Sequence, residues 1–97
     1  MTLEEFQASL AADQPQNDLT AALTGLWWDG KGEWARAHQS VQQGKDAAES
    51  WVHAYLHRKE GDEGNASYWY GRAEKSFCDE SLETEWLSIT KELLKRS

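Results

Sequence analysis

The chain contains little cysteine, little proline and no long apolar run. Cys78 is the only cysteine among 97 residues, so no internal disulfide can form, which is typical of a reducing compartment. Pro15 is the only proline, and no segment has the composition of a long linker. No apolar stretch approaches a membrane span, and the N-terminus lacks the basic and apolar regions of a signal peptide. These absences predict one cytoplasmic domain with no membrane partner.

Positive charge is missing from the first third of the chain. Residues 1–30 contain five acidic side chains and no Lys or Arg, and the whole chain carries a formal charge of −7. An acidic surface repels phosphate backbones, so no nucleic-acid partner is expected.

Recognised catalytic motifs are also missing. Gly30-Lys31-Gly32 lacks the spacing and the following Ser or Thr of a phosphate-binding loop. There is no serine-hydrolase elbow, no paired-cysteine motif and no dinucleotide fingerprint. Cys78 precedes Asp79 and Glu80, and neighbouring acids raise a thiol pKa, which disfavours a nucleophile. We therefore expect no cofactor and favour a non-enzymatic protein, with a histidine general base as the enzymatic alternative.

Helical periodicity recurs along almost the whole sequence, and strand-like alternation is absent. It predicts an all-α fold of five or six short helices in a single domain, residues 1–97. Thr2 with Glu5 forms a capping-box pair for a first helix over 2–12. Asp18 or Asn17 is predicted to cap the second helix, Asp46 the fourth and Ser81 the last, over 82–95.

Two short segments of the chain are near-copies with a period of 29 residues. Lys31-Gly32-Glu33 and Glu60-Gly61-Asp62 share a charged residue, a glycine and an acid, and each is followed by alanine, at Ala37 and Ala66. A Gly-acid turn followed by a small residue is typical of a tight helix hairpin. The repeat predicts two stacked antiparallel hairpins, over 19–42 and 46–77, with the helices at 2–12 and 82–95 capping the ends.

The segment from Trp28 to His38 resembles the middle of a tetratricopeptide repeat: an aromatic, a Gly-acid-aromatic turn and a small residue at the helix contact. The second copy matches through Ala54, Gly61 and Ala66 but lacks the turn aromatic, and the period is short. The resemblance covers 21–42 and 50–77 and implies a tetratricopeptide-like unit. The stretch from Trp51 to Asp62 is also similar to small bacterial all-helical proteins, which implies no activity.

The six tryptophans and three tyrosines exceed what one face per helix can bury. Trp28 and Tyr68 fall beside the apolar stripes, and exposed aromatics are typical anchors for a protein or peptide partner. Arg58, Lys59 and Arg72 are the cations nearest these aromatics and could receive a carboxylate or stack on a ring, although ion pairs with Glu60, Glu63 or Glu74 are the more ordinary interpretation. A thick aromatic core and a homodimer are alternatives to the partner surface.

The three histidines of the chain suggest a second kind of site. His53 and His57 are four residues apart, so both can reach one metal ion, and Glu49 one turn earlier could supply a carboxylate. His38 lies on the apolar line of its helix and faces the other two if the hairpins stack. The ordinary interpretation is histidines that cap, stack or hydrogen-bond. A protein- or peptide-binding module is thus our leading hypothesis, and a small-molecule or metal-ion site at the histidines is the alternative.

Overall fold

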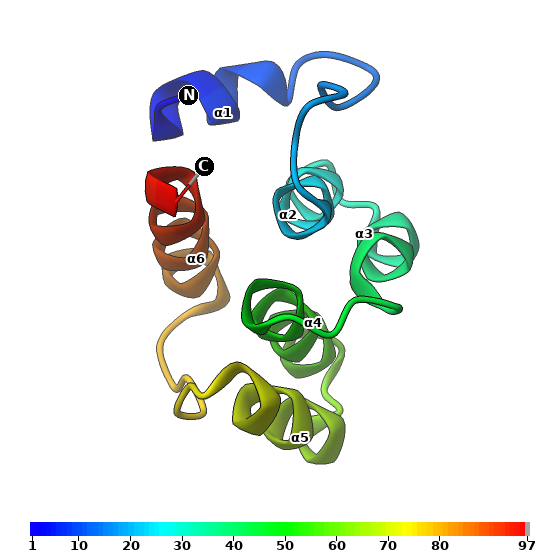
Figure 1. Ribbon diagram of the computed structural model, residues 1–97, viewed down its shortest axis with the longest axis vertical. Helices are drawn as coiled ribbons and strands as arrows, with labels where there is room; N and C mark the ends of the chain where they lie inside the picture. Colours follow the sequence, from blue (N-terminus) through cyan, green and yellow to red (C-terminus); the bar gives the residue numbers. More distant parts are fainter. Residues whose placement is uncertain (97) are drawn as a thin grey trace.

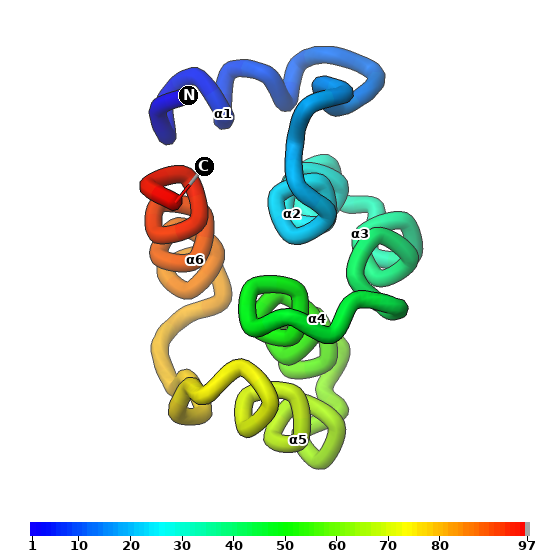
Figure 2. Tube along the Cα trace, viewed as in Figure 1, coloured from blue at the N-terminus to red at the C-terminus, as the bar shows by residue number. Residues whose placement is uncertain are grey.

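The computed structural model describes residues 1–96 and contains six α-helices, with no strand in that range. This confirms the all-α prediction. Figures 1 and 2 show the helices following one another around the molecule. Their bounds are Leu3–Ser9 (α1), Ala21–Gly30 (α2), Trp34–Val41 (α3), Ala47–Glu60 (α4), Glu63–Ala73 (α5) and Leu82–Arg96 (α6).

Helices α2 and α3 form one hairpin and α4 and α5 form another, and α3 packs against α4. Both hairpins turn through a left-handed glycine, Gly32 at φ +80° and Gly61 at φ +90°, a conformation that a residue with Cβ rarely adopts. The same turn hydrogen bond recurs in each. The Glu33 amide donates to the Trp28 carbonyl and the Asp62 amide to the His57 carbonyl, both at 2.9 Å. The 29-residue period is therefore a structural period.

Most predicted helix caps are present. Thr2 and Glu5 form the capping box, and the Asp46 carboxylate accepts the Glu49 amide at 2.7 Å. The cap of α2 was predicted wrongly, because Thr20, and not Asp18 or Asn17, accepts the Leu23 amide at 3.2 Å. Leu19 and Thr20 separate Asp18 from the first residue of the helix. Asn17, Asp18 and Thr20 can all cap a helix, and sequence alone does not show which of them does so.

The core lies between α2, α4 and α6, with α1 and α3 closing its sides. Trp27 and Trp86 are buried, and their indole N–H groups reach the Ser9 hydroxyl at 3.1 Å and the Leu26 carbonyl at 3.0 Å. Ala37 and Ala66 are completely buried, as close helix contacts require. The other main core residues are Phe6, Leu23, Leu26, Val41, Val52, Leu56, Ile89 and Leu93.

Helix α6 occupies a different place from the one that we predicted. It lies along α2 and α4, the first helices of the two hairpins, and does not stack as a cap on the end of the second hairpin (Figure 1). The segment 74–81 carries the chain from α5 back to this position. Helix α1 packs against α6 in turn. The two terminal helices thus cover one side of the hairpin pair.

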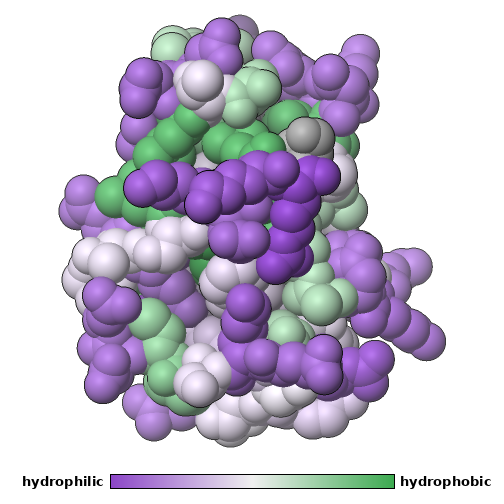
Figure 3. Space-filling model, turned by 60° about the vertical axis from the view of Figure 1, so that its left-hand side comes forward, coloured by the Kyte–Doolittle hydropathy of each residue, from purple (hydrophilic) through white to green (hydrophobic). Residues whose placement is uncertain are grey.

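The surface is mostly hydrophilic. On the side where α6 comes forward, hydrophobic surface is interrupted by rows of hydrophilic side chains (Figure 3). Met1, Tyr68 and Phe77 are the exposed large apolar residues of the described range. Within residues 1–96, no helix combines the length and the apolar character needed to cross a membrane.

Candidate metal centre

The three histidines of the chain converge between α3 and α4. The Nε2 atoms of His38 and His53 lie 3.1 Å apart, and one nitrogen from each of His38, His53 and His57 lies within 4.8 Å of the others. The ring centroids are separated by 4.7 Å, 4.8 Å and 5.2 Å. We call these three residues the histidine cluster.

Helix geometry and the hairpin turns bring the cluster together. His53 and His57 are one turn apart on α4, which Asp46 caps at its start and Gly61 ends in the left-handed conformation. His38 comes from α3, whose direction is set by the Gly32 turn and whose contact with α2 is made close by the buried Ala37. His38 thus faces both histidines of α4, an arrangement that the sequence allowed but did not establish.

Two tryptophans hold the outer faces of the cluster. Trp34 stacks on His38 with centroids 5.0 Å apart and an interplanar angle of 9°, and Trp69 stacks on His53 at 4.0 Å and 16°. The indole N–H of Trp34 donates to the Leu56 carbonyl at 2.8 Å, which fixes that ring. Aromatic packing on both sides limits how far the imidazoles can rotate.

Burial controls the charge of the cluster. His53 and His57 are 4% and 9% exposed, and His38 is half-buried. Burial, with the neighbouring imidazoles, lowers the pKa of His53 to about 4 and also lowers the pKa of His38. Both rings are therefore neutral at pH 7, which is the form that binds metal ions.

One nitrogen of His53 has no hydrogen-bond partner among the described residues. The Nδ1 atom of His53 is buried and makes no hydrogen bond with any residue from 1 to 96. An unpartnered buried polar atom is costly and calls for a structural or functional reason. The other ring nitrogen of His53, Nε2, lies 3.1 Å from Nε2 of His38. The contacts within the cluster therefore use one nitrogen of His53 and leave the other without a hydrogen bond.

Glu60 orients the third histidine from outside the cluster. Its carboxylate lies 2.6 Å from the Nδ1 atom of His57, one helical turn away. The contact leaves Nε2 of His57 as the nitrogen available to the cluster. The i, i+3 spacing of His57 and Glu60 is a sequence signal that could have identified this pair. Sequence alone suggests Glu60 only as an ion-pair partner for the nearby cations.

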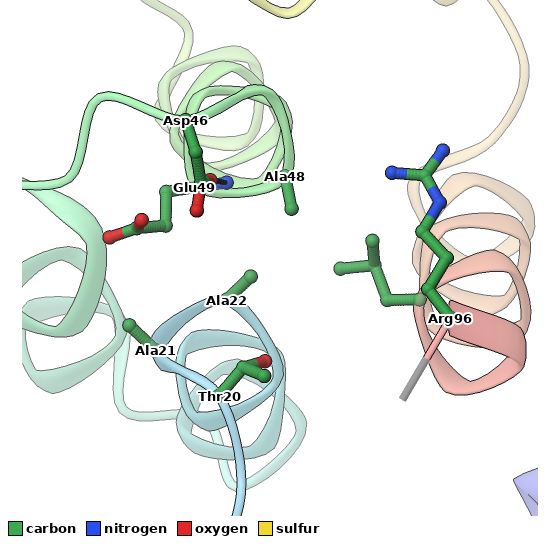
Figure 4. A pocket seen from close by; sticks show the side chains of 8 residues that line it. Thr20, Ala21, Ala22, Asp46, Ala48, Glu49 and Arg96 are labelled. Atoms are coloured by element: carbon green, nitrogen blue, oxygen red, sulfur yellow. Dashed lines mark hydrogen bonds between the residues drawn. The ribbon is translucent and has the colours of Figure 1, made fainter.

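Glu49 is not part of the cluster, contrary to the sequence prediction. It lies in the first turn of α4, beside the beginning of α2, where it lines a hollow closed on the far side by Arg96 (Figure 4). Its carboxylate lies against Gly44, which precedes the helix, and it is absent from the group of nitrogens that the three histidines form. His38, from a different helix, takes the place predicted for this third ligand.

Arg58 is also unavailable for an external ligand. Its guanidinium donates to the Glu85 carboxylate at 2.8 Å and to the Glu80 carbonyl, and its side chain is 15% exposed. The expected local partners Glu60, Glu63 and Glu74 were wrong, because α6 supplies the carboxylate from 27 residues away. Arg58 joins α4 to α6 and contributes no free cation to a surface.

The two predicted anchor aromatics differ in exposure. Trp28 is half-buried and the Arg36 guanidinium lies over its ring, 4.6 Å from the centroid. Tyr68 is 55% exposed and meets Trp69 edge-on at 5.1 Å. Tyr68 and Trp69 line a groove of about 490 Å³ between α5 and the loop after α3, which sequence reasoning missed. Its other lining residues are Gln42, Gln43, Gly44, Lys45 and Arg72.

No family model matches the chain, and no curated protein or solved structure does either.

Proposed function

We propose that this protein binds one first-row transition-metal ion through His38, His53 and His57. The observation that carries the proposal is the convergence of three imidazole nitrogens from two helices to within 4.8 Å of one another. Imidazole is a preferred ligand for zinc, copper and nickel ions. Because these are the only three histidines in the chain, the site uses every imidazole that the sequence provides.

The spacing of the nitrogens supports a single ion. Zinc–nitrogen bonds of about 2.0–2.1 Å in a tetrahedral centre place the ligand nitrogens about 3.3 Å apart. The His38 and His53 nitrogens are already 3.1 Å apart. Small side-chain rotations of His57 complete the triangle, since its nitrogen lies within 4.8 Å of the other two.

Glu60 supplies the outer contact that such centres commonly have. A metal-binding histidine usually donates its second N–H to a carboxylate or carbonyl, which fixes the ring and raises its basicity. The Glu60 carboxylate is in this position at Nδ1 of His57. Glu60 therefore holds the His57 ring in a fixed orientation before a metal ion binds, as expected of a preorganised ligand.

Calorimetric titration with Zn²⁺, Ni²⁺ and Cu²⁺ tests the proposal. We expect one ion per chain and a melting temperature that rises with metal concentration, because the ion binds the folded state. His38→Ala should abolish both effects, and Gln39→Ala, at the next and exposed position of α3, should leave them unchanged. Absence of binding by all three metals at neutral pH, or binding that survives His38→Ala, contradicts the proposal.

We propose binding of a protein or peptide partner as the second candidate function, and the groove beside Tyr68 supports it. Its lining offers the Lys45 and Arg72 cations and two glutamine amides but no carboxylate, although the chain as a whole is acidic. Neither Lys45 nor Arg72 forms an ion pair within residues 1–96. A partner segment that combines carboxylates with an apolar side chain matches this lining.

Affinity capture with variant baits tests this second candidate. A partner that uses the groove is retained by the parent protein and lost by both Tyr68→Ala and Arg72→Ala. Trp28→Ala is the matched control, because it removes an aromatic residue that lines a different hollow. A partner that is retained equally by all three variants counts against the groove.

A further inference from the structure

We infer that the metal centre keeps its fourth coordination position open, and that this position takes a small anion or a water-derived hydroxide. The inference rests on the proposed metal binding at His38, His53 and His57. It names small anions and hydroxide as the additional ligands of the site. An open position would make the centre able to bind exogenous ligands, which a closed structural site does not do.

Residues 1–96 offer three histidine ligands and no fourth cysteine, aspartate or glutamate ligand beside them. Among residues 1–96, no cysteine, aspartate or glutamate joins the three histidines within the same 4.8 Å limit. A structural zinc site in proteins is almost always closed by four protein ligands, whereas a centre with three keeps a position for water or substrate. The histidine cluster therefore has the ligand count of an open centre.

The nearest carboxylates have other tasks. Glu60 holds Nδ1 of His57, on the side of that ring away from the nitrogen left for the ion. Asp62 caps α5, and its two oxygens accept the backbone and side-chain N–H groups of Asn65 at 3.2 Å and 2.8 Å. Moving either carboxylate to the ion would break these contacts.

The only cysteine is also elsewhere. Cys78 packs against the small apolar cluster formed by Ala54, Ala66 and Tyr70 and is not among the residues that group with the histidines. Burial raises the pKa of its thiol, which opposes the thiolate form that metals bind. Within residues 1–96, neither Cys78 nor a nearby carboxylate is placed to be the fourth ligand, so we expect that ligand to come from solvent.

His38 is the most exposed of the three histidines. His53 and His57 are buried, but His38 and the flanking Trp34 and Trp69 are half-buried. A ligand from solvent is therefore expected to approach the ion past His38, beside the rings of Trp34 and Trp69. Apolar walls lower the local dielectric and strengthen the attraction between the ion and a charged ligand.

Charge balance determines the kind of ligand. Imidazole binds a metal ion in its neutral form, so the histidine cluster leaves the +2 charge of the ion uncompensated, and the nearby Glu60 carboxylate contacts His57 and not the ion. A partly buried divalent charge favours an anionic ligand, and zinc in an open centre lowers the pKa of bound water to about 7. Small anions are therefore expected to displace water from the open position.

Cobalt substitution with azide as the probe tests the inference. Co²⁺ replaces zinc in such centres and its visible absorption reports its ligands. We expect the cobalt-loaded parent protein to show a new azide-to-cobalt absorption band and shifted d–d bands that saturate at one azide per cobalt. Thiocyanate should give the same stoichiometry with a different band position.

Glu60→Gln separates the possible outcomes. If Glu60 is an outer contact, this variant responds to azide as the parent does, although it binds cobalt more weakly. A cobalt-loaded parent whose spectrum ignores a large excess of azide overturns the inference, and so does a response that appears only in Glu60→Gln, which would identify Glu60 as the fourth ligand. Failure to bind cobalt at all instead overturns the proposed metal binding itself.

Discussion

At the scale of single residues, Glu60 is the side chain through which the site can be weakened without touching a ligand. It is exposed, and its described polar contact is with Nδ1 of His57. We predict that Glu60→Gln lowers zinc affinity by about 10–100-fold, the usual effect of losing such an outer contact, while the helix content is unchanged. Competition with a chromophoric chelator measures the affinity.

The matched control is Glu63→Gln, which removes an exposed carboxylate in the next helix that contacts no histidine. Both variants change the net charge of the protein equally. Equal losses of affinity in the two variants would show that Glu60 acts through general electrostatics and not through His57.

Two tyrosines make the stability of the protein sensitive to alkaline pH. Burial and the nearby Asp29 carboxylate raise the pKa of Tyr55, and burial with the Glu85 hydrogen bond raises the pKa of Tyr70. A raised pKa in the folded state means that unfolding releases protons. The stability that the two neutral tyrosines contribute is therefore fully present below about pH 10, the pKa of an unfolded tyrosine, and this contribution is lost as the pH rises above that value.

We predict that the urea midpoint falls above this pH and that phenolate absorbance from Tyr55 and Tyr70 appears together with unfolding. A Tyr68→Phe background removes the third tyrosine from the signal. Adding Tyr55→Phe should make the midpoint less dependent on alkaline pH. Phenolate formation by both residues in the fully folded protein would contradict the prediction.

How much of the site could be predicted from sequence depended on the distance between partners along the chain. The pairing of His53 with His57 follows from helical spacing alone. The approach of His38 depends on how α3 packs on α4, which the repeat suggested but could not establish. The partner of Arg58 is Glu85, in another helix, and no local pattern identifies it.

At the scale of the elements, the hairpin turns depend on glycine in a left-handed conformation. We predict that Gly61→Ala lowers the free energy of unfolding by about 1–2 kcal/mol, because alanine is strained at a φ of +90°. An added Cβ would meet no other atom within 4 Å, so a steric clash does not contribute to this loss. Gly71→Ala is the control. It lies inside α5 with open space around its added Cβ, so it should stabilise by about 0.5–1 kcal/mol.

Urea denaturation followed by helical circular dichroism measures both changes. Effects of the same sign in Gly61→Ala and Gly71→Ala would argue against a left-handed turn at residue 61. The turn itself was predictable, because a Gly-acid pair follows each first helix of a hairpin. The docking of α6 was not, because an amphipathic stripe gives the length and the buried face of a helix but not the neighbour that covers it.

At the scale of the whole molecule, two buried ionic groups tie the hairpins to each other and to α6. Asp29 of α2 accepts hydrogen bonds from Tyr55 at 2.8 Å and from Lys59 at 2.9 Å, both on α4. Glu85 of α6 accepts from Arg58 of α4 and from the hydroxyl of Tyr70 of α5. Four helices therefore depend on two carboxylates that are 5% and 4% exposed.

The consequence is that one carboxylate on α6 should matter far more than another on the same helix. Glu85→Ala leaves Arg58 half-buried without its partner and removes the acceptor of the Tyr70 hydroxyl, so we predict a loss of about 3–5 kcal/mol. Glu92→Ala breaks only the exposed pair with Arg96 and should cost less than about 0.5 kcal/mol.

Native proteins typically have about 5–15 kcal/mol of stability, so Glu85→Ala is expected to bring the protein close to unfolding. Urea midpoints at pH 7 decide between them: similar midpoints would mean that apolar packing, and not the Glu85 contacts, holds α6 against the two hairpins.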